Sequence, residues 1–157
     1  MLLVCLGCLF SILAASPGWA AFSGTVVKVI DGDSLLIIAK KKSVEVRLYG
    51  IDCPEYGQPF AGEAKRFVTA KVFNKKVTVY PKYRDAYGRL VAIVSCGGTV
   101  LNGDIIKAGF AWVYPRYCKK KICKSWQKNE ERARQSHIGL WAGRGILLPP
   151  WQWRNSP

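Results

Sequence analysis

The chain has 157 residues, half of them apolar, and its 24 Lys and Arg against ten Asp and Glu give a formal net charge of +14. This length is typical of one domain with its own core, and the absence of internal repeats and low-complexity tracts from the sequence disfavours a solenoid or a disordered chain. The charge predicts a surface that attracts polyanions, whether nucleic acid, acidic polysaccharide or anionic membrane.

The first twenty residues have the pattern of an export signal. An almost uninterrupted apolar run extends over residues 2–15, and small residues precede Ala21. The run is too short to span a bilayer as a helix and matches the centre of a secretory signal. We predict a signal peptide over residues 1–20 and a secreted or periplasmic mature chain. A lipid anchor at Cys8 is the alternative, disfavoured by the short run before it.

Four cysteines remain in the mature chain, and an even number in an exported protein favours disulfides. Cys118 and Cys123 are expected to close a small loop, whereas pairing of Cys53 with Cys96 stays open. A zinc site is the weaker alternative. The spacing is not that of a two-residue knuckle, and the single histidine, His137, lies on a different segment.

Three segments rich in β-branched residues open the mature domain. Residues 22–29, 35–39 and 44–49 have this character, and polar residues at 31–33 and 40–43 separate them. This pattern predicts three strands joined in a meander by tight turns.

Acidic residues crowd around these turns, since five of the ten in the chain fall within 25 positions. They are Asp31, Asp33, Glu45, Asp52 and Glu55. Such crowding is costly unless a cation neutralises it, and hard oxygen ligands suit Ca²⁺ or Mg²⁺. On its own, the segment 31–33 is equally well explained as a simple turn. Because the acidic residues lie near strand ends, we expect them to converge at one end of the sheet.

Helical and strand patterns alternate through the rest of the chain. Apolar residues recur at helical spacing over residues 60–73, and further helices are expected over 100–108 and 124–135. Two more strands are expected over 77–80 and 90–94, joined by a long basic and aromatic loop.

Five strands interrupted by a helix predict an α+β fold that is mainly a β barrel. The expected architecture is an OB-fold five-stranded barrel with about three helices over residues 21–148. Residues 149–157 form a Pro- and Trp-rich C-terminal tail, which we expect to be an extended strap because its prolines cannot continue a helix. Three tryptophans are expected in the core, namely Trp112, Trp126 and Trp141.

Four spaced motifs resemble the staphylococcal nuclease (thermonuclease) family. They are Val29–Ser34, Arg47–Glu55, Asp85–Arg89 and Gly109–Val113, in this order. The resemblance extends over residues 22–141. It implies an OB-fold, Ca²⁺-dependent endonuclease that hydrolyses DNA and RNA with little base preference. The family cuts the 5′ P–O bond and leaves 3′-phosphorylated products. We expect a monomer that prefers single-stranded or unstructured regions.

The resemblance also implies a calcium site. Asp33 and Asp52 would bind Ca²⁺ through their carboxylates, and the main-chain carbonyl of Cys53 would supply another oxygen. Asp31 would hold a metal-bound water. Cys53 stands where the family more often has Thr, a change that a backbone ligand tolerates.

Three further residues would carry the catalysis that the resemblance implies. Glu55 would position or deprotonate the attacking water, while Arg47 and Arg89 would hold the phosphodiester. Phosphodiester hydrolysis builds negative charge on the phosphoryl oxygens, and guanidinium forks stabilise that charge in a way that a Lys cannot. Taken singly, Arg47 would be explained as a partner of Glu45, and Arg89 as a turn residue.

Substrate contacts are expected from aromatic and basic side chains. The resemblance implies that Tyr87 and Tyr117 touch the nucleotide. Lys82 and Tyr83 lie on the basic loop, where an aromatic ring can stack on a base. The lysine runs 40–42 and 119–121 would be solvated or extend a phosphate track.

Three functions compete at this point. The first is a secreted Ca²⁺-dependent nuclease. The second is a catalytically silent nucleic-acid-binding barrel, which would gain from losing the carboxylates. The third is a cationic adhesion protein that binds the cell envelope or heparin, which leaves the acidic cluster unexplained.

Overall fold

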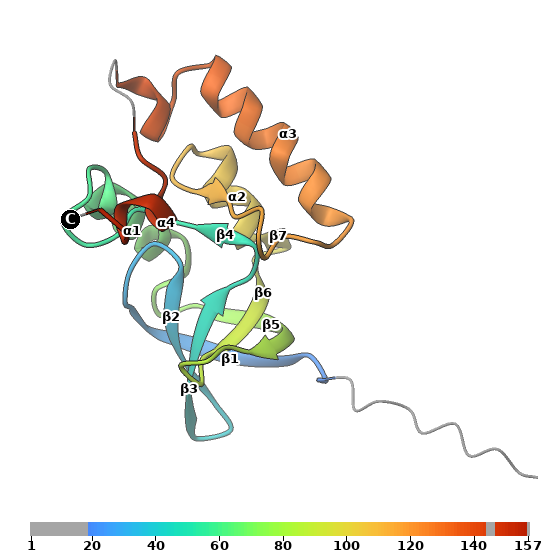
Figure 1. Cartoon of the computed structure of the whole chain (residues 1–157). Coiled ribbons are helices and arrows are strands. Elements are labelled where there is room, and N and C mark those ends of the chain that lie inside the picture. Colours follow the sequence, from blue (N-terminus) through green and yellow to red (C-terminus); the bar gives the residue numbers. More distant parts are fainter. Residues whose placement is uncertain (1–18, 144–146, 157) are drawn as a thin grey trace, which may run out of the picture.

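The structure, a computed structural model, describes residues 19–143 and 147–156 (Figure 1). The predicted signal peptide lies outside the described residues except for Trp19 and Ala20. None of the helices in the described ranges is both long enough and apolar enough to cross a membrane.

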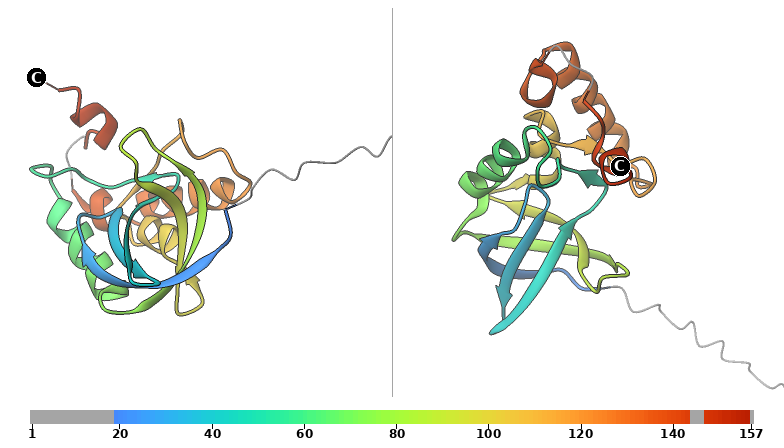
Figure 2. Two further views of the ribbon diagram at one scale, coloured as in Figure 1. Left: turned by 90° about the horizontal axis from the view of Figure 1, so that it is seen from below. Right: turned by 60° about the vertical axis from the view of Figure 1, so that its left-hand side comes forward.

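Five strands form a closed barrel, as the sequence predicts. They are β1 (Phe22–Val29), β2 (Ser34–Ala39), β3 (Lys42–Leu48), β5 (Lys76–Arg84) and β6 (Leu90–Cys96). Neighbours in the order β3-β2-β1-β5-β6 pair antiparallel, and a parallel pairing of β3 with β6 closes the barrel. The left view of Figure 2 shows these strands curving around into a barrel. The first three form the expected meander.

The barrel is filled by buried apolar side chains that come from all five strands. The fully buried ones include Val26, Leu35, Ile37, Val46, Val79 and Val94. Helix α1 (Ala61–Val72) adds Ala64, Val68 and Val72, which lie on one face because they are spaced by four residues. This amphipathic helix therefore completes the core, in agreement with its sequence pattern.

The remaining helices lie at one end of the barrel. Helices α2 (Leu101–Lys107) and α3 (Ile122–Gln135) pack against each other, and in Figure 1 α3 lies on the outer side of α2. Three of the other short elements are strands: β4 (Ile51–Asp52), β7 (Thr99–Val100) and β8 (Trp112–Val113). Strand β4 pairs with β8, and β7 pairs with β6. The 3₁₀ helix η1 (Gly139–Ala142) follows α3. Trp112 and Trp126 are buried as expected, and Trp141 is partly buried against Trp112.

Two expectations about local structure are wrong. The loop expected over residues 81–89 is shorter, because its first four residues belong to β5, which continues past a bulge after Pro81 and pairs with β6 as far as Arg84. The tail is not fully extended, because α4 (Pro150–Trp153) forms a short helix in it. Proline disrupts a helix when it lies in the interior, but it suits the first helical position, where its missing backbone N–H is not needed.

A buried amide ties α2 to the barrel. Asn102 is fully buried, and its Oδ1 accepts the backbone N–H of Val94 at 3.0 Å. Its Nδ2 donates to the carbonyl oxygen of Tyr49 at 3.0 Å. No local pattern in the sequence marks this residue as buried. It fixes the turn at residues 49–50, from which β4 carries the chain into the acidic cluster.

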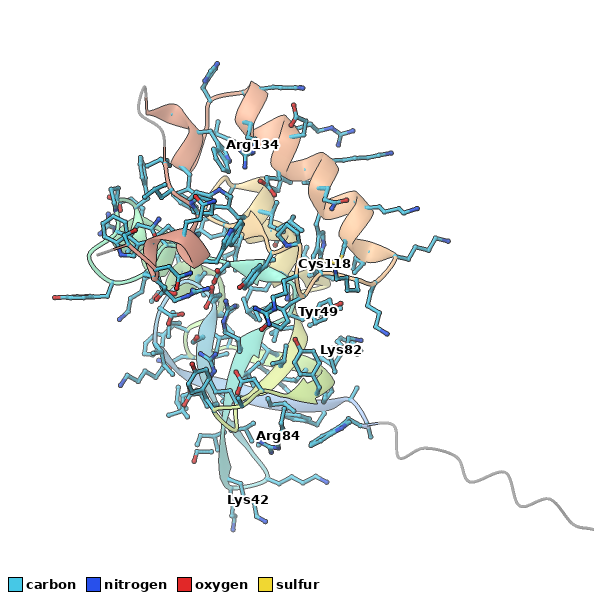
Figure 3. All side chains as sticks on the ribbon, in the orientation of Figure 1. Lys42, Tyr49, Lys82, Arg84, Cys118 and Arg134 are labelled. Carbon is cyan, nitrogen blue, oxygen red and sulfur yellow. A yellow bond between two sulfur atoms is a disulfide. The ribbon has the colours of Figure 1, made fainter. Side chains whose placement is uncertain are left out.

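The predicted disulfide between Cys118 and Cys123 is present. It packs against Gly50, whose φ is 72° and where an added Cβ would lie 2.7 Å from Cys118 Sγ, so that only glycine fits. Tyr49 and Cys118 lie close together in Figure 3, and the hydroxyl of Tyr49 accepts the backbone N–H of Lys119 at 3.1 Å. Cys53 is a separate buried thiol.

Candidate active site

A cleft of about 700 Å³ opens at one end of the barrel. Its charged lining residues include Asp31, Asp33, Arg47, Glu55, Arg89 and Arg154. Tyrosines also line it, namely Tyr83, Tyr87, Tyr114 and Tyr117. Register explains the convergence: Ser34, at the start of β2, pairs with Arg47 at the end of β3. Most of the predicted site residues thus meet in one place, although they come from widely separated parts of the chain.

Arg47 holds two buried aspartates together. Its Nη1 lies 3.1 Å from Asp33 Oδ2, and its Nη2 lies 2.7 Å from Asp52 Oδ1. Nη1 also donates to the carbonyl oxygens of Leu48 and Ile51, each at 3.0 Å. No ion pair of the described residues joins Arg47 to Glu45, so the simpler explanation for this arginine does not hold.

Asp33 brings three candidate metal-binding groups into one network. Its Oδ2 accepts the backbone N–H of Cys53 at 2.7 Å, and its own N–H donates to Asp31 Oδ1 at 2.9 Å. Gly32 lies between Asp31 and Asp33 in the chain, and a Cβ added to it would lie 2.6 Å from the Cβ of Cys53. Glycine at this turn is therefore required for the close approach of the two segments.

Burial and crowding perturb the acidic groups. Burial raises the pKa of Asp33 well above its ordinary value; Arg47 opposes this shift, and the charges of Asp31 and Asp52 add to it. Burial also raises the pKa of Asp52, although Arg154 and Arg47 both act in the opposite direction. An additional cation at this position would favour the ionised form of both carboxylates.

The donor set fits a hard divalent cation in its chemistry. Asp33, Asp52 and the carbonyl of Cys53 offer oxygen ligands, which Ca²⁺ and Mg²⁺ prefer. Within the described ranges, no three His, Cys, Asp or Glu side chains are already grouped as a metal site. Instead, guanidinium groups of Arg47 and Arg154 contact the carboxylate oxygens.

Glu55 lies at the rim of the cleft, on the loop after β4. Its backbone N–H donates to Gln58 Oε1 at 3.0 Å, and its side chain is 38% exposed. Gln58 is itself buried and donates from Nε2 to the carbonyl oxygen of Leu148 at 2.6 Å. The sequence does not predict this role for Gln58, because a single Gln in a loop carries no signal of burial.

Arg89 is positioned by a turn that Asp85 organises. Asp85 Oδ1 accepts the backbone N–H groups of Tyr87 and Arg89 at 3.0 Å each, and its Oδ2 accepts Arg89 Nε at 2.8 Å. Burial raises the pKa of Asp85, but the hydrogen bonds from Arg89 and Tyr87 outweigh it and hold the pKa below its ordinary value. The terminal nitrogens of Arg89 have no hydrogen-bond partner in the part of the chain that the structure describes, so they remain available to an anion.

Two exposed tyrosines flank the cleft. Tyr87 is 85% exposed. The guanidinium carbon of Arg89 lies over the Tyr87 ring, 5.4 Å from the ring centroid. Tyr117 is exposed and packs edge-on against Tyr114. Tyr83 is a partly buried wall residue that packs edge-on against Tyr49.

The predicted basic residues are placed differently. Lys82 is adjacent to Tyr83 on β5 but is not among the residues that line the cleft. The lysine run at residues 40–42 lies at the opposite end of the β2–β3 hairpin from Arg47, and Figure 3 shows Lys42 at the far tip of this hairpin.

One charged residue in the cleft was not anticipated. Arg154, just after α4, places its Nη2 2.9 Å from Asp52 Oδ2 and its Nη1 3.3 Å from Asp52 Oδ1. Nη1 also contacts Glu55 Oε1. These partners are 102 and 99 positions away in the chain, so no local sequence pattern could reveal the contact.

The fold and the cleft define a class: an OB-fold protein whose barrel end gathers buried carboxylates and arginines, a combination suited to phosphate chemistry. Residues 45–143, more than half of the chain, match the family model described as staphylococcal nuclease homologue. The chain is 33% identical over 154 residues to a micrococcal nuclease of Shigella flexneri, covering 92% of this chain and 87% of that protein.

Two more relatives have similar coverage. The chain is 33% identical to protein ParB of Escherichia coli, covering 92% of this chain and 85% of the relative. It is 37% identical over 131 residues to an uncharacterized endonuclease of Haemophilus influenzae, covering 83% and 71% of the two chains. The chain therefore belongs to the staphylococcal nuclease family.

Proposed function

We propose that the protein is an exported, Ca²⁺-dependent endonuclease that hydrolyses DNA and RNA with little base preference. Cleavage would occur at the 5′ P–O bond and leave 3′-phosphorylated products. The observation that carries the proposal is that Asp33, Glu55 and Arg89 line one cleft of a nuclease-family barrel. Asp52 lies buried beside it and contacts Arg47 and Arg154, which also line the cleft. The disulfide between Cys118 and Cys123 supports export, because such bonds persist in oxidising compartments.

The carboxylates of Asp33 and Asp52 and the carbonyl of Cys53 would hold the cation, with Asp31 close enough to hold a water. A bound Ca²⁺ would supply Lewis-acid polarisation of the phosphate. Arg47 would act mainly by positioning, because four contacts within the chain already engage its two terminal nitrogens.

Glu55 and Arg89 would act on the substrate itself. The half-exposed carboxylate of Glu55 can accept a proton from a water in the cleft or orient that water. Arg89 would hold a phosphate through its free terminal nitrogens, which counters the negative charge that grows in the transition state. Loss of such an arginine costs on the order of 10³-fold in rate in other phosphoryl-transfer enzymes.

The preference for substrate would follow from the exposed rings. Tyr87 and Tyr117 can stack on bases only where these are unpaired, which favours single-stranded or unstructured regions. In the cleft, arginines can contact phosphates and tyrosine rings can stack on the faces of bases, and neither kind of contact distinguishes one base from another. The expected substrate is therefore DNA or RNA of any sequence, cut by a monomer.

The experiment that tests the proposal is cleavage of single-stranded DNA by the chain from Ala21 to Pro157. Wild type is assayed with Ca²⁺ and with a chelator, beside Glu55→Ala and Arg89→Ala. Arg132→Ala, an exposed arginine on α3, is the matched control. We expect cleavage that requires Ca²⁺, falls at least about 10³-fold in both site variants and is unchanged in the control. A folded wild type that binds DNA but never cuts it would leave the silent binding barrel as the better explanation.

A further inference from the structure

The two arginines at the acidic cluster are held very differently. Arg47 is 14% exposed and bonded to the backbone of its own strand region as well as to the aspartates. Arg154 is 40% exposed, and its guanidinium contacts the side chains of Asp52 and Glu55. Arg47 is thus bonded to the backbone of the barrel, whereas the Arg154 guanidinium contacts only side chains among the described residues.

Arg154 reaches the cleft as part of a docked segment. The ring of Trp151 stacks on Tyr114 with centroids 4.9 Å apart and planes 9° apart. Before α4, the carbonyl oxygen of Leu148 accepts the side-chain N–H of Gln58. In Figure 1 and in the right view of Figure 2, α4 lies beside β4, which carries Asp52. Contacts at separate points along residues 148–154 therefore hold the tail on the site.

The docked segment uses atoms that a cation and a substrate would need. Both carboxylate oxygens of Asp52 receive guanidinium N–H groups, and Oδ2 is engaged by Arg154. Ca²⁺ requires direct contact with such oxygens at about 2.3–2.6 Å. Trp151 covers one face of Tyr114, a ring that lines the cleft and on which a base would otherwise stack.

We infer that the segment around α4 is autoinhibitory: its docking and the binding of a divalent cation at Asp52 exclude each other. The segment substitutes a guanidinium for the cation and an indole for a stacked base. Linkage makes the effect reciprocal, so docking weakens cation binding by the same factor by which the cation weakens docking. The inference rests on the proposed function in taking Asp52 as a cation ligand.

The first test is the dissociation constant of Ca²⁺, measured by calorimetry on the chain from Ala21 to Pro157. We expect Arg154→Ala to bind Ca²⁺ about tenfold more tightly, which corresponds to a competing contact of about 1.4 kcal/mol. Trp151→Ala should shift the constant in the same direction without any change of charge. Arg132→Ala removes the same charge from α3 and should leave the constant unchanged.

The second test follows the segment itself by amide hydrogen exchange. In wild type, the amides of residues 152–156, which are hydrogen-bonded within the segment, should exchange slowly without Ca²⁺ and faster with it, because the cation releases the segment. In Arg154→Ala they should exchange fast in both conditions.

The outcomes separate this inference from the proposed function. Equal Ca²⁺ affinities in all four proteins, or weaker binding by Arg154→Ala, would overturn autoinhibition while leaving the cation site intact. If neither wild type nor Arg154→Ala binds Ca²⁺, the Ca²⁺ dependence of the proposed function is refuted and the autoinhibition with it.

Discussion

Replacement of Arg47 by alanine should strongly destabilise the protein, because it leaves two buried carboxylates without their shared partner. The side chains of Asp33 and Asp52 are only 7% and 1% exposed, so both carboxylates depend on partners within the protein. Removing one partner of a buried ion pair typically costs about 3–5 kcal/mol. The carbonyl oxygens of Leu48 and Ile51 also lose a donor. We therefore expect Arg47→Ala to lower the free energy of unfolding by about 3–5 kcal/mol.

The assay is urea unfolding at pH 7, followed by circular dichroism, with a chelator present. Arg47→Lys should fall between wild type and Arg47→Ala, since it keeps the charge but not the fork that reaches both aspartates. The matched control is Arg66→Ala, whose partner Glu63 and guanidinium are exposed. That change should cost less than about 0.5 kcal/mol. If Arg47→Ala lies within about 1 kcal/mol of the control, Arg47 does not hold the acidic cluster together, and the reasoning from burial fails.

Three further changes test the supports of the site. Asn102→Ala should cost about 2–4 kcal/mol in urea unfolding, because it leaves a buried amide of β6 and a buried carbonyl of the turn before β4 unpaired; a cost below about 1 kcal/mol would mean that water replaces the side chain. Replacing Cys118 and Cys123 by serine should cost about 2 kcal/mol, the loop-closure value for so short a loop, and reduction of wild type by dithiothreitol should give the same loss. Asp85→Asn should destabilise the turn that positions Arg89 at pH 7. Because the folded pKa of Asp85 is depressed, its stabilisation is present above the unfolded value of about 3.9 and is lost as pH falls below it. The difference in unfolding free energy between Asp85→Asn and wild type should therefore shrink in acid, and a difference that grows there would contradict the assignment.

The barrel was predictable because its signals are local. Segments rich in β-branched and apolar residues mark the strands, and polar turns at residues 31–33 and 40–43 separate them. Once these strands are placed, the acidic residues are expected at one end of the barrel. Asp33 directly precedes β2, and Asp52 follows the end of β3 after a short turn. The helix α1 was predictable for the same reason, since its apolar positions recur at helical spacing.

The supports of the site were not predictable, because their roles depend on contacts between distant segments. Asn102 looks like an ordinary polar residue near a helix start, and only the approach of β6 and the turn at residue 49 makes it a buried staple. Gln58 is unremarkable in sequence, yet its amide bonds Glu55 on one side and Leu148 on the other. The length of β5 depends on a bulge at Pro81, which composition does not reveal.

Charge balance explains why the unforeseen contact of Arg154 falls where it does. Asp31, Asp33, Asp52 and Glu55 gather around a single framework cation, Arg47, so elementary electrostatics requires further positive charge. The sequence supports that requirement but does not decide whether a metal ion or an arginine meets it, since the chain has 24 Lys and Arg besides this one acidic cluster. Only the fold, by starting α4 at Pro150, carries Arg154 to the cluster. The proposed cation site and its proposed internal competitor therefore have the same physical origin, which is why the affinity of Ca²⁺ in Arg154→Ala tests both.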